Sequence, residues 1–213
     1  MHLLAERALW WPKARALVVA DVHWGKGDAL RRGGVAVPEG STAADLERLE
    51  QLLARYPARQ MIVLGDLVHR PPRSAEQPWV RSARQWRESH ADIAMRLVVG
   101  NHDLARRPEH TKASLAHLGD WELLAEGTVE SGVALWHEPP VAIEVASMAG
   151  HWHPVQQLRP GARQRLRVPV FWRCGNRLVL PSFGQLTGGH PIKTHPRNQT
   201  WAVTPQSVVP LAD

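Results

Sequence analysis

The stretch Met95-Arg-Leu-Val-Val-Gly-Asn-His-Asp103 joins a mostly apolar run directly to a polar cluster. Ala16–His23, which reads ALVVADVH, and Met61–Asp66, which reads MIVLGD, repeat this arrangement. Short continuous apolar runs are typical of strands that are buried on both faces of a sheet. Ligands bind at the carboxyl ends of strands in open α/β sheets, so the three polar clusters are expected at one edge.

The segments between these strands predict helices, and the second half of the chain predicts further strands. Ser41 or Thr42 can cap a helix that ends near Tyr56, and Trp79–His90 is expected to form another. From Glu122 onward helical periodicity is weak and short apolar runs alternate with loops, which favours a second sheet. The sequence therefore predicts a mixed α/β (α+β) fold in a single domain over residues 1–213.

The composition is that of a globular protein with a real core. The chain has 213 residues, of which 44% are hydrophobic and 22% charged. No apolar run approaches the roughly 20 residues of a membrane helix, and the first residues do not resemble a signal peptide. The single cysteine, Cys174, fits a reducing cytoplasm. We therefore expect a cytoplasmic protein without membrane contact, in which any metal site uses His, Asp, Glu or Asn.

The net charge of +6 leaves two interpretations open. It is either a generic basic surface or a surface that attracts a polyanion such as nucleic acid. Charge alone does not decide between them.

Two further clusters complete a set of metal-binding residue types. His137 follows the apolar run VALW, and Gly150-His-Trp-His153 follows VASMA. Carboxylates, an amide oxygen and imidazoles together favour manganese, iron or zinc over calcium or magnesium. Two such ions about 4 Å apart can clamp the attacking and leaving oxygens of a displacement at phosphorus. The pattern thus indicates a phosphoester hydrolysis site.

The order D-x-H, GD, GNHD, H and GHxH resembles the calcineurin-like metallophosphoesterases over Asp21–His153. The resemblance implies a four-layer αββα sandwich, with two mixed sheets flanked by helices. It also implies that His102 assists the leaving group and that Arg70 binds phosphate oxygens. It assigns the first metal to Asp21, His23, Asp66 and His153, and the second to Asp66, Asn101, His137 and His151.

One position departs from that pattern. In the longer GD-x-x-D-R form of the motif an aspartate precedes the arginine and orients the catalytic histidine, but this chain has His69 there. A histidine cannot anchor an imidazolium as a carboxylate does. What orients His102 is thus left open, with Asp103 as a neighbouring candidate.

Further stretches, some of them around the metal motifs, carry a second, closer resemblance over nearly the whole chain. They include DVHWGK at 21–26, RRGG at 31–34, VPEG at 37–40, HEPP at 137–140, GHWHP at 150–154, RQRLR at 163–167, SFG at 182–184 and TGG at 187–189. In these stretches the chain resembles the ligase-associated DNA damage response endonucleases. The resemblance implies a manganese-dependent phosphodiesterase and DNA endonuclease, associated in bacterial repair with a DNA ligase, a helicase and a nuclease of the metallo-β-lactamase type.

Two questions about substrate remain open from the sequence. Trp24 and Trp152 lie within or beside metal motifs, and each either stacks on a nucleobase or packs against the walls of the site. The alternatives to DNA cleavage are hydrolysis of a small phosphodiester or nucleotide, and a non-catalytic scaffold of the same fold. An open, basic, tryptophan-lined cleft would favour DNA, whereas a lidded pocket would favour a nucleotide.

Overall fold

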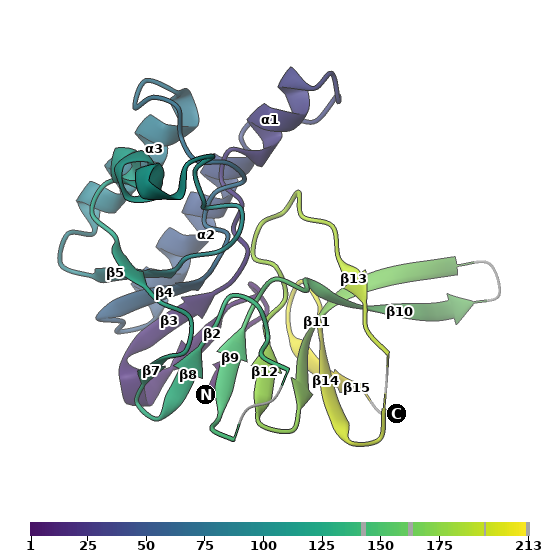
Figure 1. Cartoon of the computed structure of the whole chain (residues 1–213). Helices are drawn as coiled ribbons and strands as arrows, with labels where there is room; N and C mark the ends of the chain where they lie inside the picture. The colour runs from purple at the N-terminus through teal and green to yellow at the C-terminus, as the bar shows by residue number, and fades with distance from the viewer. Residues whose placement is uncertain (142–143, 162–163, 194, 212–213) are drawn as a thin grey trace.

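A computed structural model describes residues 1–141, 144–161, 164–193 and 195–211 of the chain. It contains two mixed β-sheets that lie against each other, with the helices gathered beside the first sheet (Figure 1). The predicted α/β class with two mixed sheets is confirmed.

The first sheet is built from the N-terminal half of the chain in simple order. Its strands β1 and β2 are antiparallel to their neighbours, whereas β3 to β6 run parallel to one another. The parallel strands therefore bring their carboxyl ends to one edge. The order is β1 (His2–Leu3), β2 (Leu9–Trp11), β3 (Ala16–Val19), β4 (Gln60–Leu64), β5 (Ala94–Val98) and β6 (Glu122–Leu124).

The helices connect these strands and cover one face of the first sheet. Leu49 and Leu52 of α2 and Ala83 of α3 are buried in the same core as Leu17 and Val63 of the sheet. The helices are α1 (Lys26–Arg32), α2 (Ser41–Arg55), α3 (Pro78–Ser89) and α4 (Thr111–Leu115), with 3₁₀ turns η1 (Pro12–Ala14), η2 (Pro108–His110) and η3 (Ala116–Leu118). In the described residues, no helix is long and apolar enough to cross a membrane.

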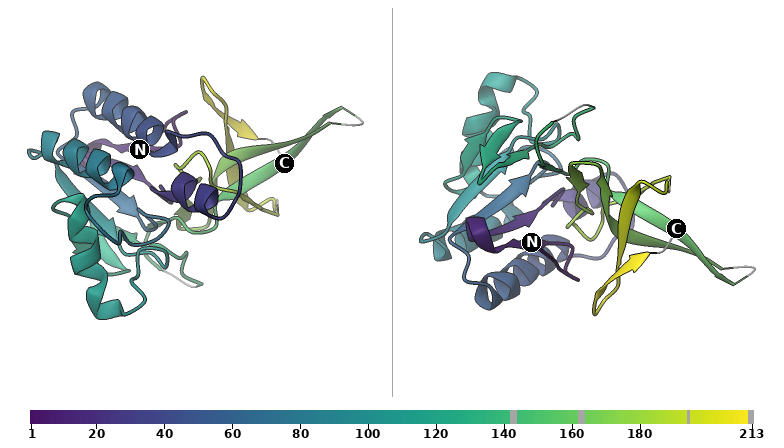
Figure 2. Two further views of the ribbon diagram at one scale, coloured as in Figure 1. Left: turned by 90° about the horizontal axis from the view of Figure 1, so that it is seen from above. Right: turned by 90° about the horizontal axis from the view of Figure 1, so that it is seen from below.

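The second sheet is built from the C-terminal half. Its strand order is β13-β10-β11-β12-β9-β8-β7, and β14 pairs with both β11 and β15. The strands are β7 (Thr128–Glu130), β8 (Val133–Leu135), β9 (Ser147–Ala149), β10 (Pro154–Gly161), β11 (Gln164–Cys174), β12 (Arg177–Val179), β13 (His190–Pro191), β14 (Asn198–Val203) and β15 (Val208–Leu211). The hairpin of β10 and β11 extends away from the rest of the molecule (Figure 2).

A second core fills the space between the two sheets. Along β3 and β4 alternate side chains point to opposite faces, so Val18 and Ile62 turn away from the helices and join Leu135 and Phe171 of the second sheet. Among the described residues after Leu124 there is no helix, so the helical layer that was expected on the outer face of the second sheet is not found there. That face carries a small cluster of its own around Val170 instead. The weak helical periodicity of this half accounts for the difference.

Candidate metal centre

Every predicted ligand lies just beyond the end of a strand, at an edge that the two sheets share. Asp21 and His23 follow β3, Asp66 follows β4, and Asn101 follows β5. From the second sheet, His137 follows β8, and His151 and His153 follow β9. The structure thus brings together side chains from residues 21 to 153 at the place that the strand-end pattern predicts.

The backbone at these positions adopts an unusual conformation. Asp21, His23, Asp66, His151 and His153 all have positive φ angles, between 45° and 67°. Such angles are uncommon for residues other than glycine, cost of order 1 kcal/mol each, and cluster at functional sites. Gly150 permits the close approach of the strands, because a Cβ atom there would lie 2.8 Å from an Asp21 carboxylate oxygen. The unfavourable backbone conformation at these five residues directs their side chains toward the shared edge of the sheets.

The first group of candidate ligands consists of Asp21, His23, Asp66 and His153, whose donor atoms lie within 4.8 Å of one another. His153 Nε2 is 3.3 Å from Asp21 Oδ1, and His23 Nε2 is 3.7 Å from Asp66 Oδ2. The Nε2 atoms of His23 and His153 face each other at 3.5 Å. All four are the residues that the resemblance assigns to the first metal.

The second group consists of Asp66, Asn101, His137 and His151. His137 Nε2 lies 3.0 Å from Asn101 Oδ1 and 3.5 Å from Asp66 Oδ1. His151 Nδ1 lies 3.0 Å from the same His137 nitrogen. Asp66 directs one carboxylate oxygen toward each group, which is the arrangement that a bridging ligand requires.

The chemistry of this donor set fits two divalent cations. His137 Nδ1 lies 3.2 Å from the carbonyl oxygen of Leu64, and His153 Nδ1 lies 3.2 Å from that of Gly188. Donation from each Nδ1–H would leave the Nε2 lone pair facing the centre, as in metal-ligating histidines generally. Burial lowers the pKa of His23 to about 2, which keeps its imidazole neutral. Imidazole nitrogens that face one another at this distance share either a proton or a cation, and the carboxylates beside them favour a cation.

The buried carboxylates of Asp21 and Asp66 are also stabilised by nearby positive charge. Asp21 and Asp66 are almost completely buried, and burial raises the pKa of Asp66, an effect that His137 partly opposes. A buried carboxylate pair is costly without compensation. Lys26, at the start of α1, is half-buried and lies within the field of both aspartates, which partly offsets the lowering of its pKa by burial. The DVHWGK stretch contains this lysine, although the sequence did not assign it to the centre.

His102 sits at the border of the centre and is oriented by a backbone group. Its Nδ1 lies 3.0 Å from the carbonyl oxygen of His69, and its own backbone N–H donates to Asp66 Oδ1 at 2.8 Å. The His102 and His69 rings are stacked, with centroids 5.2 Å apart. The residue that replaces the expected aspartate therefore contributes its main chain to the orientation of His102. Burial lowers the pKa of the His69 ring to about 4.

The carboxylate of Asp103 is engaged by backbone groups, whereas the His102 ring lies against the His69 carbonyl. The Asp103 carboxylate is fully buried and accepts hydrogen bonds from the backbone N–H of Val68 at 3.0 Å and of Gly100 at 2.9 Å. Asp103 therefore ties the loop that follows β4 to the loop that follows β5. Burial raises its pKa to about 8, against the effect of these hydrogen bonds.

The predicted substrate residues fall into different environments. Arg70 is exposed and directly follows His69 in the chain. Trp152 is half-buried and lines a pocket. Trp24, in contrast, is only 1% exposed and packs edge-on against Trp86 and Trp121 in the core under the helices. Base stacking on Trp24 is thereby excluded, and its expected role is corrected to packing.

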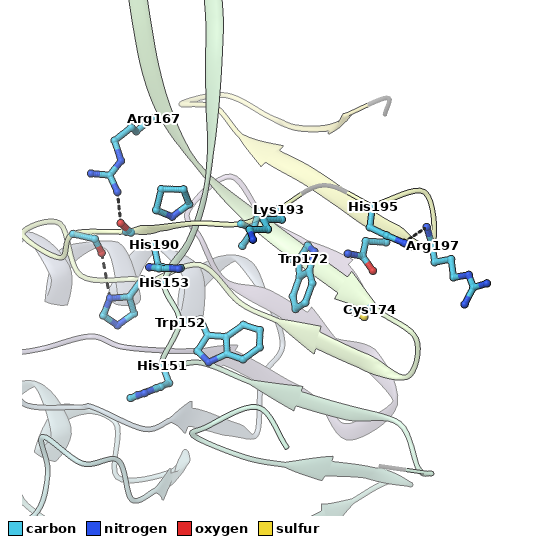
Figure 3. A pocket seen from close by; sticks show the side chains of 15 residues that line it. His151, Trp152, His153, Arg167, Trp172, Cys174, His190, Lys193, His195 and Arg197 are labelled. Carbon is cyan, nitrogen blue, oxygen red and sulfur yellow. Dashed lines mark hydrogen bonds between the residues drawn. The ribbon is translucent and has the colours of Figure 1, made fainter. Parts of the chain in front are cut away.

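The pocket next to the centre has a volume of about 1210 Å³ and is open to solvent (Figure 3). It lies between the base of the β10–β11 hairpin, the segment 188–193 and the two candidate ligands His151 and His153. Trp152 and Trp172 contribute aromatic surface, and Arg167, Lys193 and Arg197 contribute positive charge.

A known family and a solved nuclease structure match most of this chain. Residues 14–171 match the calcineurin-like phosphoesterase family. The crystal structure of the nuclease MPE of Pseudomonas putida is similar, with 37% identity, a TM-score of 0.78, and coverage of 98% of this chain and 93% of that one. A protein of unknown function from Aquifex aeolicus, AQ665, matches at 18% identity and a TM-score of 0.43, over 70% of this chain and 82% of that one. No curated protein sequence matches. The chain belongs to the calcineurin-like phosphoesterases and is a metal-dependent phosphoester hydrolase.

Proposed function

We propose that the protein is a manganese-dependent phosphodiesterase that cuts DNA internally, as an endonuclease. The observation that carries this proposal is the open, positively charged and tryptophan-lined pocket directly beside the candidate metal centre. A wide, basic opening suits a long polyanion, and the similarity to a Pseudomonas putida nuclease supports the same substrate class.

The residues have separate tasks in the proposed reaction. Asp21, His23, Asp66 and His153 would hold one divalent ion, and Asp66, Asn101, His137 and His151 the other. When bound, the two ions supply an activated water molecule and positive charge for the phosphoryl oxygens. Arg70 would contact the phosphate from the exposed rim.

His102 would donate a proton from Nε2 to the leaving oxygen. If its Nδ1–H donates to the His69 carbonyl, the ring is held with Nε2 free for the substrate. A positioned histidine that acts as a general acid contributes about 10²- to 10⁴-fold in rate.

We place the activity in bacterial DNA repair, in the cytoplasm. This context rests on the resemblance to the ligase-associated endonucleases, which implies a DNA ligase, a helicase and a metallo-β-lactamase-type nuclease as partners. The alternative of a small phosphodiester or nucleotide substrate is less well supported, because the pocket is open rather than lidded. A non-catalytic scaffold would not need strained ligand positions or an oriented His102.

The decisive assay compares single-stranded DNA, duplex DNA and an aryl phosphodiester with the manganese-loaded protein. We expect cleavage of DNA and of the ester, with loss of both upon chelation. Parallel reactions with iron or zinc test the choice of metal. Hydrolysis of the ester without cleavage of either DNA would contradict the nuclease proposal, whereas a protein that hydrolyses none of them would favour the scaffold.

A further inference from the structure

The pocket of Figure 3 shares His151 and His153 with the candidate metal centre. A nucleotide bound at the centre would therefore extend into this pocket. His151 and His153 belong to different ligand groups, and Trp152 lies between them in the sequence. Figure 3 shows the Trp152 ring pointing toward Trp172 and away from the His151 side chain. Because His151 and His153 line the same pocket as this indole, a strand whose phosphate is held at the metals could continue along it.

Two indoles provide the aromatic surface of the pocket. The rings of Trp152 and Trp172 have centroids 5.6 Å apart and planes inclined by 40°. Trp172 lies on β11 and packs against the cluster of Val168, Val170 and Ala202, which holds it in place. Trp152 comes from the loop after β9 and is half-buried. A half-buried indole beside a fixed one offers a flat apolar face, which is what a nucleobase stacks on.

The charges around the indoles are those that a nucleic acid strand requires. Arg167, Lys193 and Arg197 line the pocket, and none of its described lining residues is acidic. The Arg167 guanidinium also donates to the carbonyl oxygen of Gly189, which links the hairpin to the loop over the pocket. Cations beside an aromatic platform are the combination found in proteins that bind single strands through backbone and bases together.

We propose that this pocket is a nucleobase subsite: the base next to the scissile phosphate leaves its stack and lies on Trp152, with the strand continuing past Lys193 and Arg197. The inference rests on the proposed nuclease function and adds a binding site to it. The volume of about 1210 Å³ exceeds the roughly 300–1,000 Å³ of typical small-molecule sites, so a nucleotide unit fits.

The test compares binding of two labelled DNA strands of equal length, one intact and one with all bases removed. Manganese-loaded protein that carries His102→Ala limits cleavage during the measurement. Into this background we introduce Trp152→Ala, Trp152→Leu or Trp152→Phe. Fluorescence anisotropy gives the Kd of each pair, while metal content and thermal melting verify that the variants are folded and loaded.

We expect Trp152→Ala to weaken binding of the intact strand by about 10- to 100-fold and to leave the abasic strand unaffected. Leucine keeps apolar bulk without a π-face and should behave like alanine, whereas phenylalanine should retain most of the affinity. Equal binding of the intact strand by Trp152→Ala and its parent would overturn the subsite, as would an equal loss for both strands. Cleavage of DNA by the protein with wild-type His102 is scored separately, so a failed subsite and a failed nuclease proposal give different results.

Discussion

At the scale of single residues, His102 depends on a carbonyl group where a carboxylate was expected. The His69 carbonyl lies 3.0 Å from Nδ1 and can fix the ring orientation, but it carries only a partial charge. A carboxylate would in addition stabilise the imidazolium form. The chain therefore keeps the positioning part of the usual histidine–acid pair and supplies it from the main chain.

This arrangement predicts unequal effects for two neighbouring histidines. His102→Ala should lower kcat by about 10²- to 10⁴-fold, because the general acid is lost. His69→Ala should lower kcat far less, because the carbonyl that orients His102 remains. Hydrolysis of an aryl phosphodiester by manganese-loaded protein measures both effects, with metal content as the control. A loss in His69→Ala as large as that in His102→Ala would show that the His69 ring itself takes part.

The sequence did not distinguish the roles of Trp24 and Trp152. Trp24 and Trp152 each stand beside a ligand, yet one is 1% exposed in the core and the other lines an open pocket. Sequence adjacency does not reveal the direction of a side chain in a loop with positive φ angles. The role of His69 could not be predicted for a related reason. Every residue carries a carbonyl group, and no sequence signal distinguishes the one that orients His102.

At the scale of secondary-structure elements, Asp103 links the ends of two parallel strands. Its carboxylate accepts the N–H groups of Val68 and Gly100, which belong to the loops after β4 and β5. Asp66 lies in the first loop and Asn101 in the second. The relative placement of these two candidate ligands therefore depends on a carboxylate that does not face the metals.

Asp103→Ala should consequently reduce the free energy of unfolding by about 2–5 kcal/mol, since two buried N–H donors lose their acceptor. Asp103→Asn retains an acceptor oxygen and should cost less. Urea denaturation in the presence of a chelator measures this effect apart from metal binding. An unfolding midpoint for Asp103→Ala equal to that of the wild type would mean that the two loops are held by other contacts.

The elements that the sequence predicted best are those with a clean apolar pattern. The strands at Ala16, Met61 and Met95 and the helix that begins at Ser41 are present as expected. The short helix Lys26–Arg32 has no such pattern: it follows Gly25, whose φ angle is 79°, and is followed by Gly33. The long hairpin of β10 and β11 was only partly anticipated, since prolines, arginines and glutamines interrupt its apolar pattern and its arm extends away from the main body (Figure 2).

At the scale of the whole molecule, the candidate ligands come from both sheets. Each group combines residues that follow β3, β4 or β5 of the first sheet with residues that follow β8 or β9 of the second. Bound ions would therefore cross-link the two sheets as well as serve the reaction. The convergence was predictable in outline, because strand ends gather at one edge, but the pairing of the two sheets depends on contacts far apart in sequence.

Metal removal should accordingly destabilise the protein. Each ion that binds only the folded state at about 100 times its Kd adds about 2.7 kcal/mol, and 1 kcal/mol shifts Tm by about 2–4 °C in a chain of this size. Chelation should therefore lower Tm by about 5–10 °C for each ion that is removed, and added manganese should restore it. Asp66→Asn provides the control. This substitution weakens the ligand that both ions share, so chelation should lower the Tm of the variant by less than that of the wild type. An unchanged Tm in protein that has verifiably lost its metal would mean that packing between Val18, Ile62 and Phe171 holds the sheets together without help from the ions.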